Sequence, residues 1–172
     1  MIIRTPADYH IMNWANGRGQ TTELLREDGP DGLHLRLSIA TVAEDGPFSL
    51  FPGIDRVLTV ICGPGFHLTG SGLRLHAAPL RPVSFPGDAT IAATDVTAPS
   101  EDFNVMTARR LPAPRVWPAH TGPINPQGRL FLLPLGPTTV NGKLLAARDL
   151  LETRGSVVIS PDHPIIAVDI PD

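Results

Sequence analysis

Apolar and polar residues alternate along much of this chain with a period of two, which indicates β-strands and not helices. The clearest case is segment 33–42 (LHLRLSIATV), in which one face holds leucine and isoleucine and the other holds Arg36 and Ser38. This alternation predicts a half-buried strand. Segment 56–62 (RVLTVIC) is a nearly continuous apolar run, so we expect a strand that is covered on both faces.

Short turn motifs separate the other predicted strands. Gly70-Ser71-Gly72 and Asn141-Gly142 are typical of hairpins, because these residues adopt the positive φ angles of tight turns. Segment 143–153 is predicted to be strand, turn and strand, with Arg148-Asp149 at the turn. Further strands are predicted at 65–69, 73–77, 81–85, 89–96, 103–108, 129–133, 138–145, 156–160 and 164–170.

Helix-breaking residues are frequent, with 16 glycines and 19 prolines in 172 residues. Long helices are incompatible with this density, so the predicted fold class is all-β. Segment 112–128 holds five prolines and two glycines, which predicts a connection without strands. The β-rich segments on either side suggest a doubled barrel: one compact unit, 1–172, with halves at 1–110 and 129–172 joined by 111–128.

Charge and composition exclude several classes of partner. The net charge is −3 without a basic run, so no nucleic-acid partner is predicted. No segment approaches the ~20 apolar residues of a membrane span, and residues 1–10 lack a signal-peptide core. Cys62 is the single cysteine and lies in an apolar run, which predicts a buried, inert thiol. A cytoplasmic protein without a membrane partner is expected.

The usual motifs of metal and nucleophile chemistry are not found in the sequence. No two histidines have the one-residue or four-residue spacing that places ligands on one face of a strand or helix, so no metal is predicted. His67 and His76 are expected to face each other across a hairpin as a surface pair. There is no Gly-x-Ser-x-Gly motif, and Asn16-Gly17-Arg18-Gly19 lacks the lysine of a phosphate loop. We therefore predict no cofactor.

Arg36 and Ser38 are the first candidates for ligand binding. If their face lines a barrel interior, a buried arginine there needs an anion. Asp55 or Asp102 could supply it internally, in which case Arg36 is structural. A ligand carboxylate is the other alternative, and Arg36→Ala would then abolish binding and leave the protein folded.

The remaining candidates are polar residues beside aromatic ones. Trp14 and Asn16 could provide an aromatic wall and an amide, or Trp14 could simply pack under a turn. Asp102 could cap a turn, and Asn104 could be a pocket amide. Segment 45–63 predicts a fixed loop at a barrel mouth, since it holds two phenylalanines and places Asp55 and Arg56 directly before a strand.

Several of these segments resemble the HutD/Ves proteins. The matching segments are WANGRG from Trp14 to Gly19, RLSIATVAEDGPFSLFPGIDRVLTV from Arg36 to Val60, FPGD from Phe85 to Asp88, and DFNVMTARR from Asp102 to Arg110. The chain departs from the family pattern at Ala15, where a lysine is usual, and at Arg18, which replaces the middle of three glycines.

The resemblance implies a bicupin, two small cupin-like barrels in one chain, without the histidine-rich metal motif of catalytic cupins. It also implies a link to histidine utilisation and a ligand such as formylglutamate or urocanate. The first functional reading is a non-catalytic protein that binds a small carboxylate and regulates or buffers amino-acid catabolism, with a homodimer as an open alternative to a monomer.

Two other functions stay open. A metal-independent isomerase or hydrolase would use Asp55 or Asp102 as a base, and a strongly raised carboxyl pKa beside a pocket would favour it. A ligand-free interaction module would pair Arg36 internally and leave no pocket.

Overall fold

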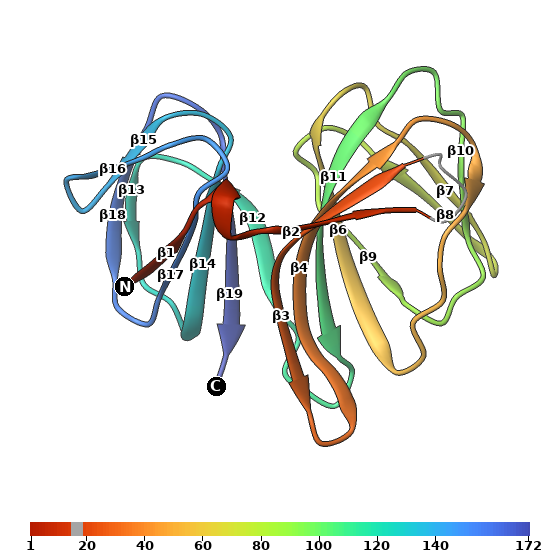
Figure 1. Cartoon of the computed structure of the whole chain (residues 1–172), viewed down its shortest axis with the longest axis horizontal. Coiled ribbons are helices and arrows are strands. Elements are labelled where there is room, and N and C mark those ends of the chain that lie inside the picture. The colour runs from red at the N-terminus through yellow and green to blue at the C-terminus, as the bar shows by residue number, and fades with distance from the viewer. Residues whose placement is uncertain (15–18) are drawn as a thin grey trace. The chain divides into compact units, whose positions relative to one another are not determined.

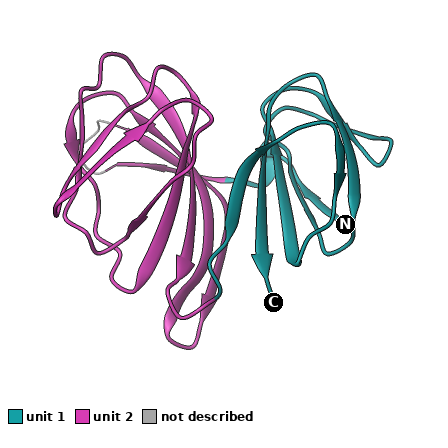
Figure 2. Cartoon of the chain, turned by 180° about the vertical axis from the view of Figure 1, so that it is seen from behind, with its two compact units in different colours: residues 1–9, 112–172 teal, residues 10–111 magenta. Residues whose placement is uncertain are grey.

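The computed structural model describes residues 1–14 and 19–172, and these residues form β-strands with one short 3₁₀ turn, η1 (Pro6–Asp8). The all-β class predicted from the alternation and the breaker residues is confirmed (Figure 1). The chain divides into two compact units, residues 10–111 and residues 1–9 with 112–172 (Figure 2). The first nine residues, which the sequence analysis grouped with the N-terminal half, therefore cluster with the C-terminal residues.

The unit of residues 10–111 contains a six-stranded and a four-stranded antiparallel sheet. The larger sheet has the order β2 (His10–Asn13), β3 (Gln20–Gly29), β4 (Gly32–Val42), β11 (Ser100–Ala108), β6 (Ile54–Cys62) and β9 (Val83–Pro86). The smaller sheet has the order β5 (Gly46–Pro47), β10 (Ala92–Thr94), β7 (Phe66–Gly70) and β8 (Leu73–Ala77).

The other unit also consists of two antiparallel sheets. Its five-stranded sheet has the order β1 (Ile2–Arg4), β17 (Leu150–Thr153), β14 (Gly128–Pro134), β19 (Ile165–Pro171) and β12 (Arg115–Ala119). Its four-stranded sheet has the order β13 (Gly122–Ile124), β18 (Val157–Pro161), β15 (Thr138–Val140) and β16 (Lys143–Leu145).

Both predicted hairpin turns are confirmed. Ser71 and Gly72 have φ angles of 47° and 74°, and Asn141 and Gly142 have φ angles of 49° and 77°. Two consecutive positive φ angles define the hairpin turn that matches the twist of antiparallel strands. The turn predicted at Arg148 is also present, between β16 and β17.

Two predictions about local structure are wrong, and the strand β3 was not predicted. Segment 112–128 contains β12 and β13, which carry Pro118 and Pro123; both are edge strands, where a missing N–H costs no ladder hydrogen bond. Strand β3 was missed because register shifts at Glu23/Leu25 and Glu27/Asp28 interrupt its period of two. Cys62 is exposed, since β6 ends at this residue and the apolar run does not continue beyond it.

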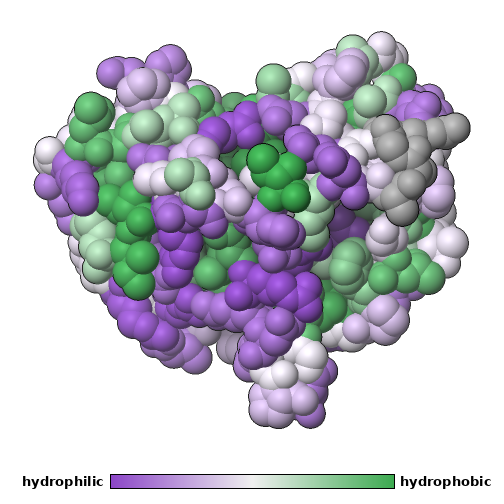
Figure 3. Space-filling view, viewed as in Figure 1, coloured by the Kyte–Doolittle hydropathy of each residue, from purple (hydrophilic) through white to green (hydrophobic). Residues whose placement is uncertain are grey.

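The core of the 10–111 unit joins the two sheets. Leu58 and Val60 of the larger sheet pack in one cluster with Phe66, Leu68 and Ala93 of the smaller sheet. This cluster connects the two sheets of the unit. The large apolar residues that are exposed include the neighbours Met1 and Ile2, and the face seen in Figure 3 carries both hydrophobic and hydrophilic residues.

Truncating this core should destabilise the protein far more than truncating the surface. We expect Leu68→Ala, at a fully buried side chain, to lower the free energy of unfolding by about 2–5 kcal/mol. The matched control is Leu50→Ala, at a side chain that is 54% exposed, which should change it by less than about 0.5 kcal/mol. Urea unfolding measures both, and equal losses in the two variants would contradict this assignment of the core.

Candidate functional site

The strand register places the polar candidates on one face of the larger sheet. Met106 of β11 lies opposite Arg36 of β4 and Arg56 of β6, so these three residues form a row across the sheet. Asn104 lies opposite Ser38 in the next row along β11. Alternate residues of a strand point to the same face, so both rows face the same side.

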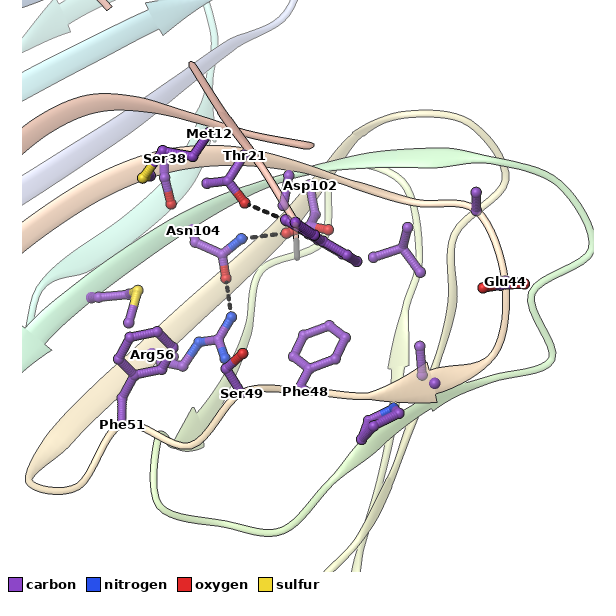
Figure 4. Close-up of a pocket in the computed structure, with 18 of the residues that line it drawn as sticks. Met12, Thr21, Ser38, Glu44, Phe48, Ser49, Phe51, Arg56, Asp102 and Asn104 are labelled. Carbon is purple, nitrogen blue, oxygen red and sulfur yellow. Dashed lines mark hydrogen bonds between the residues drawn. The ribbon is translucent and has the colours of Figure 1, made fainter. Parts of the chain in front are cut away.

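This face forms one wall of a cavity of about 570 Å³ in the 10–111 unit (Figure 4). The sheet contributes Arg36, Ser38, Arg56, Asp102 and Asn104 to its lining. Apolar lining comes from Met12, Val42 and Met106 of the same sheet and from Trp14, Pro47, Phe48, Phe51 and Ala93 of other segments. A small set of polar groups within an apolar cavity is typical of a small-molecule site.

Arg56 is the most deeply buried cation of this lining, with 7% of its surface exposed. Its guanidinium carbon lies 5.1, 5.5 and 5.1 Å from the ring centres of Phe48, Phe51 and Phe85, which are cation–π distances. Its Nη2 donates a hydrogen bond of 2.7 Å to Asn104 Oδ1. Its Nε is buried without a partner among the described residues. Burial lowers the pKa of Arg56 to about 10, although the charge of Asp102 acts in the opposite direction.

Asp102 is the buried acid beside Arg56, with 1% of its surface exposed. Its Oδ1 accepts a hydrogen bond from Asn104 Nδ2, and its Oδ2 has no partner among the described residues. Burial raises the pKa of Asp102 to about 7, although Arg56 and the Asn104 hydrogen bond partly oppose this rise. Asn104 thus joins the two charged groups, as the dashed lines in Figure 4 show.

Arg36 lines the cavity, and its charge is compensated within the protein. Its Nε lies 2.7 Å from Glu23 Oε2, and both side chains are largely buried. The internal anion is therefore neither of the two aspartates considered from the sequence. Glu23 comes from β3, the strand that the sequence pattern did not reveal.

Asp55 does not line the cavity, although Arg56 beside it does. Neighbouring residues of a strand point to opposite faces, so the burial of Arg56 turns Asp55 outward. There Arg109 Nε donates to Asp55 Oδ1 at 2.8 Å, and Arg109 Nη2 donates to Asp88 Oδ1 at 2.9 Å. Asp55 thus belongs to an exposed ion-pair network.

Trp14 is held at the cavity by two hydrogen bonds. Its Nε1 donates to Thr21 Oγ1 at 2.8 Å, and its backbone N–H donates to the Gly19 carbonyl at 2.9 Å. A Cβ at Gly19 would lie 2.6 Å from the Trp14 ring, so the ring position requires glycine there. Asn16, the other candidate of this segment, lies outside the described residues.

Phe48 and Phe51 belong to the site, although the sequence identified them only as neighbours in a fixed loop. Backbone hydrogen bonds anchor this loop at both residues, from Phe48 N to the Ile91 carbonyl at 2.9 Å and from Phe51 N to the Gly87 carbonyl at 2.7 Å. A Cβ at Gly87 would lie 2.8 Å from the Phe51 carbonyl oxygen, so this contact needs glycine. The available sequence signal was the pair of phenylalanines, with an arginine five residues after the second.

The described residues contain no group of three or more histidine, cysteine, aspartate or glutamate side chains that could hold a metal ion. His67 and His76 face each other across the β7–β8 hairpin with ring centres 4.7 Å apart, as predicted. A carboxylate oxygen of Asp95 lies 3.1 Å from His67 Nδ1, a neighbour that the spacing did not reveal. No helix in the described part of the chain is long and apolar enough to cross a membrane.

Solved structures with the same architecture define the class of protein as an all-β bicupin. HutD from Pseudomonas fluorescens SBW25, in a formate condition, superposes with a TM-score of 0.85 at 28% identity over 99% of this chain and 97% of that chain. A conserved protein of unknown function from Pseudomonas aeruginosa PAO1 gives 0.84 at 29% identity, covering 99% and 98%. A nickel-bound bacterial pirin from Escherichia coli gives 0.68 at 11% identity, covering 99% and 98%, which shows the fold alone.

The HutD family model matches residues 6–126, and the chain belongs to this family. A protein encoded in the hutC 3′ region of Pseudomonas putida is 38% identical over 106 residues, covering 59% of this chain and 55% of the relative. Protein Ves of Citrobacter koseri is 38% identical over 99 residues, covering 56% and 52%. The match thus spans about half the length of each of these relatives.

The burial of Asp102 should make stability depend on pH. Its pKa of about 7 in the folded state lies above the ordinary value of 3.8, so folded protein holds a proton between these values that unfolded protein has lost. The contribution of this bound proton to the free energy of unfolding is complete below pH 3.8 and is lost as the pH rises to about 7. We expect the free energy of unfolding to fall across this window by on the order of a few kcal/mol.

Urea unfolding from pH 4.5 to 8 measures this dependence in the wild type and in Asp102→Asn. The amide of the variant cannot ionise. The difference in the free energy of unfolding between the two proteins should therefore change with pH between 3.8 and about 7 and stay constant above this window. The lowered pKa of Glu152 has the opposite sign and acts at lower pH, and it is common to both proteins. A constant difference throughout would show that Asp102 does not hold a proton in the folded state.

Proposed function

We propose that the cavity binds a small carboxylate-bearing metabolite through Arg56, and that the protein acts as a binding protein in histidine or amino-acid catabolism. The proposal is supported above all by the state of Arg56, a buried guanidinium that reaches its nearest acid through an amide and not directly. A buried charge without a close counter-ion is costly. A carboxylate in the cavity would supply the anion and accept from the nitrogens that Asn104 does not use.

The comparison with Arg36 supports Arg56 as the residue that binds the carboxylate of the ligand. Arg36 already has a carboxylate at 2.7 Å, so a ligand at this residue would compete with Glu23. The rings around Arg56 exclude water from its sides, and this desolvation strengthens an ion pair formed from the cavity. Arg36, Ser38 and Trp14 would then contact other parts of the ligand.

The family supports the choice of ligands for a first test. One relative is encoded beside hutC, and a similar structure was obtained in a formate condition. Formate, urocanate and N-formyl-L-glutamate carry carboxylates of increasing size. Formamide and imidazole are controls that lack the carboxylate, and a cytoplasmic location remains a prediction of this reading.

Arg56→Met should abolish carboxylate binding. We expect at least one of the three carboxylates to raise the Tm of the wild type, with Kd rising roughly 100-fold or more in the variant, the scale of removing one partner of a buried charge pair. Methionine fills a similar apolar volume, so the variant should stay folded. Thermal shift, calorimetric titration and circular dichroism measure these properties.

Two matched variants distinguish the cavity from the rest of the surface. Arg109→Met removes an arginine that is 44% exposed outside the cavity, and it should leave Kd unchanged. Arg36→Met should weaken binding by less than Arg56→Met, because Glu23 already compensates Arg36. Binding that survives in Arg56→Met and disappears in Arg36→Met would move the anion site to Arg36. The absence of any shift with all three carboxylates would refute the proposal.

A second candidate is a metal-independent enzyme that uses Asp102 as general acid or base. The observation in its favour is the pKa of about 7, which suits proton transfer near neutral pH, at a residue that lines the cavity. Proton NMR of urocanate or N-formyl-L-glutamate incubated with the protein would detect turnover. Turnover that is lost in Asp102→Asn would establish the enzyme, whereas binding without turnover would support the binding protein.

The third reading, a ligand-free interaction module, has less support. It predicts an internal partner for Arg36, which Glu23 provides, but it also predicts that there is no pocket. The cavity of about 570 Å³ argues for a ligand.

A further inference from the structure

The hydrogen bonds around Asn104 determine where a proton on Asp102 must be. Arg56 Nη2 can only donate, so the Asn104 atom that faces it at 2.7 Å is the amide oxygen. The amide nitrogen of Asn104 consequently faces Asp102 and donates to Oδ1. Since Oδ1 is an acceptor in this arrangement, the free position for a proton is Oδ2.

Asp102 Oδ2 is buried and has no hydrogen-bond partner among the described residues. The Asp102 side chain lines the cavity, so a group inside the cavity is the available partner. An ionised oxygen without a donor is strongly disfavoured in such a place. A protonated oxygen, in contrast, is a donor without an acceptor among the residues that the structure describes.

Among the described residues, the charges around Asp102 leave little compensation for a second anion. Arg56 of β6 is the cation joined to it through Asn104, and Arg36 of β4 is paired with Glu23 of β3. The acids near it add negative charge: Glu101 precedes it on β11, and Glu44 and Asp45 line the cavity beyond the end of β4. No histidine is among the residues that line the cavity.

We propose that Asp102 binds the ligand as the neutral acid, donating a hydrogen bond from Oδ2 to the ligand carboxylate, so that binding above neutral pH takes up one proton. This inference rests on the proposed function, because it requires a carboxylate at Arg56. The ligand stays ionised, the proton comes from solvent, and no covalent bond to carbon changes. Asp102 is thereby a ligand-contacting residue that makes affinity depend on pH.

Electrostatics gives the reason for the coupling. Two carboxylates that share one guanidinium in a buried site do not both ionise readily, so the arrival of the second raises the proton affinity of the first. Burial in the folded protein already raises the pKa of Asp102 to about 7. Above that pH the protein must be protonated before it can bind, which weakens the apparent affinity.

Calorimetric titration of the full chain with N-formyl-L-glutamate from pH 6 to 9 tests the inference. This probe has no group that titrates in the range. We expect a nearly constant Kd below about pH 7 and a rise of roughly tenfold per pH unit well above it. Titrations at pH 8.5 in two buffers with different ionisation enthalpies should report an uptake of about one proton.

Three variants separate this role from simple burial. Asp102→Asn keeps an amide donor at the position of Oδ2, so it should bind at all pH values with a constant Kd and no proton uptake. Asp102→Ala lacks the donor, so it should bind more weakly than the wild type at pH 6 and also be independent of pH. Asp162→Asn removes an exposed acid that does not line the cavity, and it should keep the pH dependence of the wild type.

The possible results have distinct meanings. The affinity of the wild type could instead increase with pH and be lost in Asp102→Asn. This result would show that the ionised carboxylate of Asp102 accepts a hydrogen bond from the ligand, which overturns the inference. A wild-type Kd that is constant to pH 9 would overturn it as well, while leaving carboxylate binding through Arg56 intact. If formate, urocanate and N-formyl-L-glutamate all fail to bind, the proposed function and this inference fail together.

Discussion

The burial of the Arg56 guanidinium is the constraint on which the rest of the site depends. An isolated charge in an apolar interior is strongly disfavoured, and three phenyl rings and one amide contact this one. None of these contacts neutralises the charge, and the nearest acid is reached through Asn104. The guanidinium is therefore well packed, while its charge has no direct counter-ion among the described residues. This combination is what distinguishes a binding pocket from an internal ion pair.

The architecture supplies these contacts from segments that are distant in the sequence. The amide and the acid come from β11, which lies between the strands of the two cavity arginines. Phe48 and Phe51 come from a loop that backbone hydrogen bonds to Ile91 and Gly87 hold in place. Each contact depends on register, because a shift of one residue would turn Asn104 and Arg56 to opposite faces. The close approach at Gly87 shows that even the turn residues are constrained by the position of the rings.

The sequence predicts the fold class, both hairpins and the shared face of Arg36 and Ser38, since these follow from local periodicity and turn chemistry. It does not predict Glu23, because the register shifts of β3 remove the periodic signal of the strand that carries it. It also could not decide between Asp55 and Arg56, since the direction of a strand face depends on which neighbour the tertiary structure buries. Segment 112–128 shows the same limit, because prolines are tolerated in strands whose edge position is a property of the whole sheet.

The two arginines of the cavity illustrate two solutions to the same electrostatic problem. Arg36 has a glutamate of its own at 2.7 Å, so its charge is compensated whether or not the cavity is filled. Arg56 has an acid whose own ionisation is disfavoured by burial, so the compensation of its charge by the protein depends on pH. A fixed pair at Arg56 would be more stable and would leave nothing for a ligand to contribute. In the proposed function, the weaker, proton-dependent partner keeps the guanidinium available to a ligand, and the same Asp102 would also suit an acid–base catalyst.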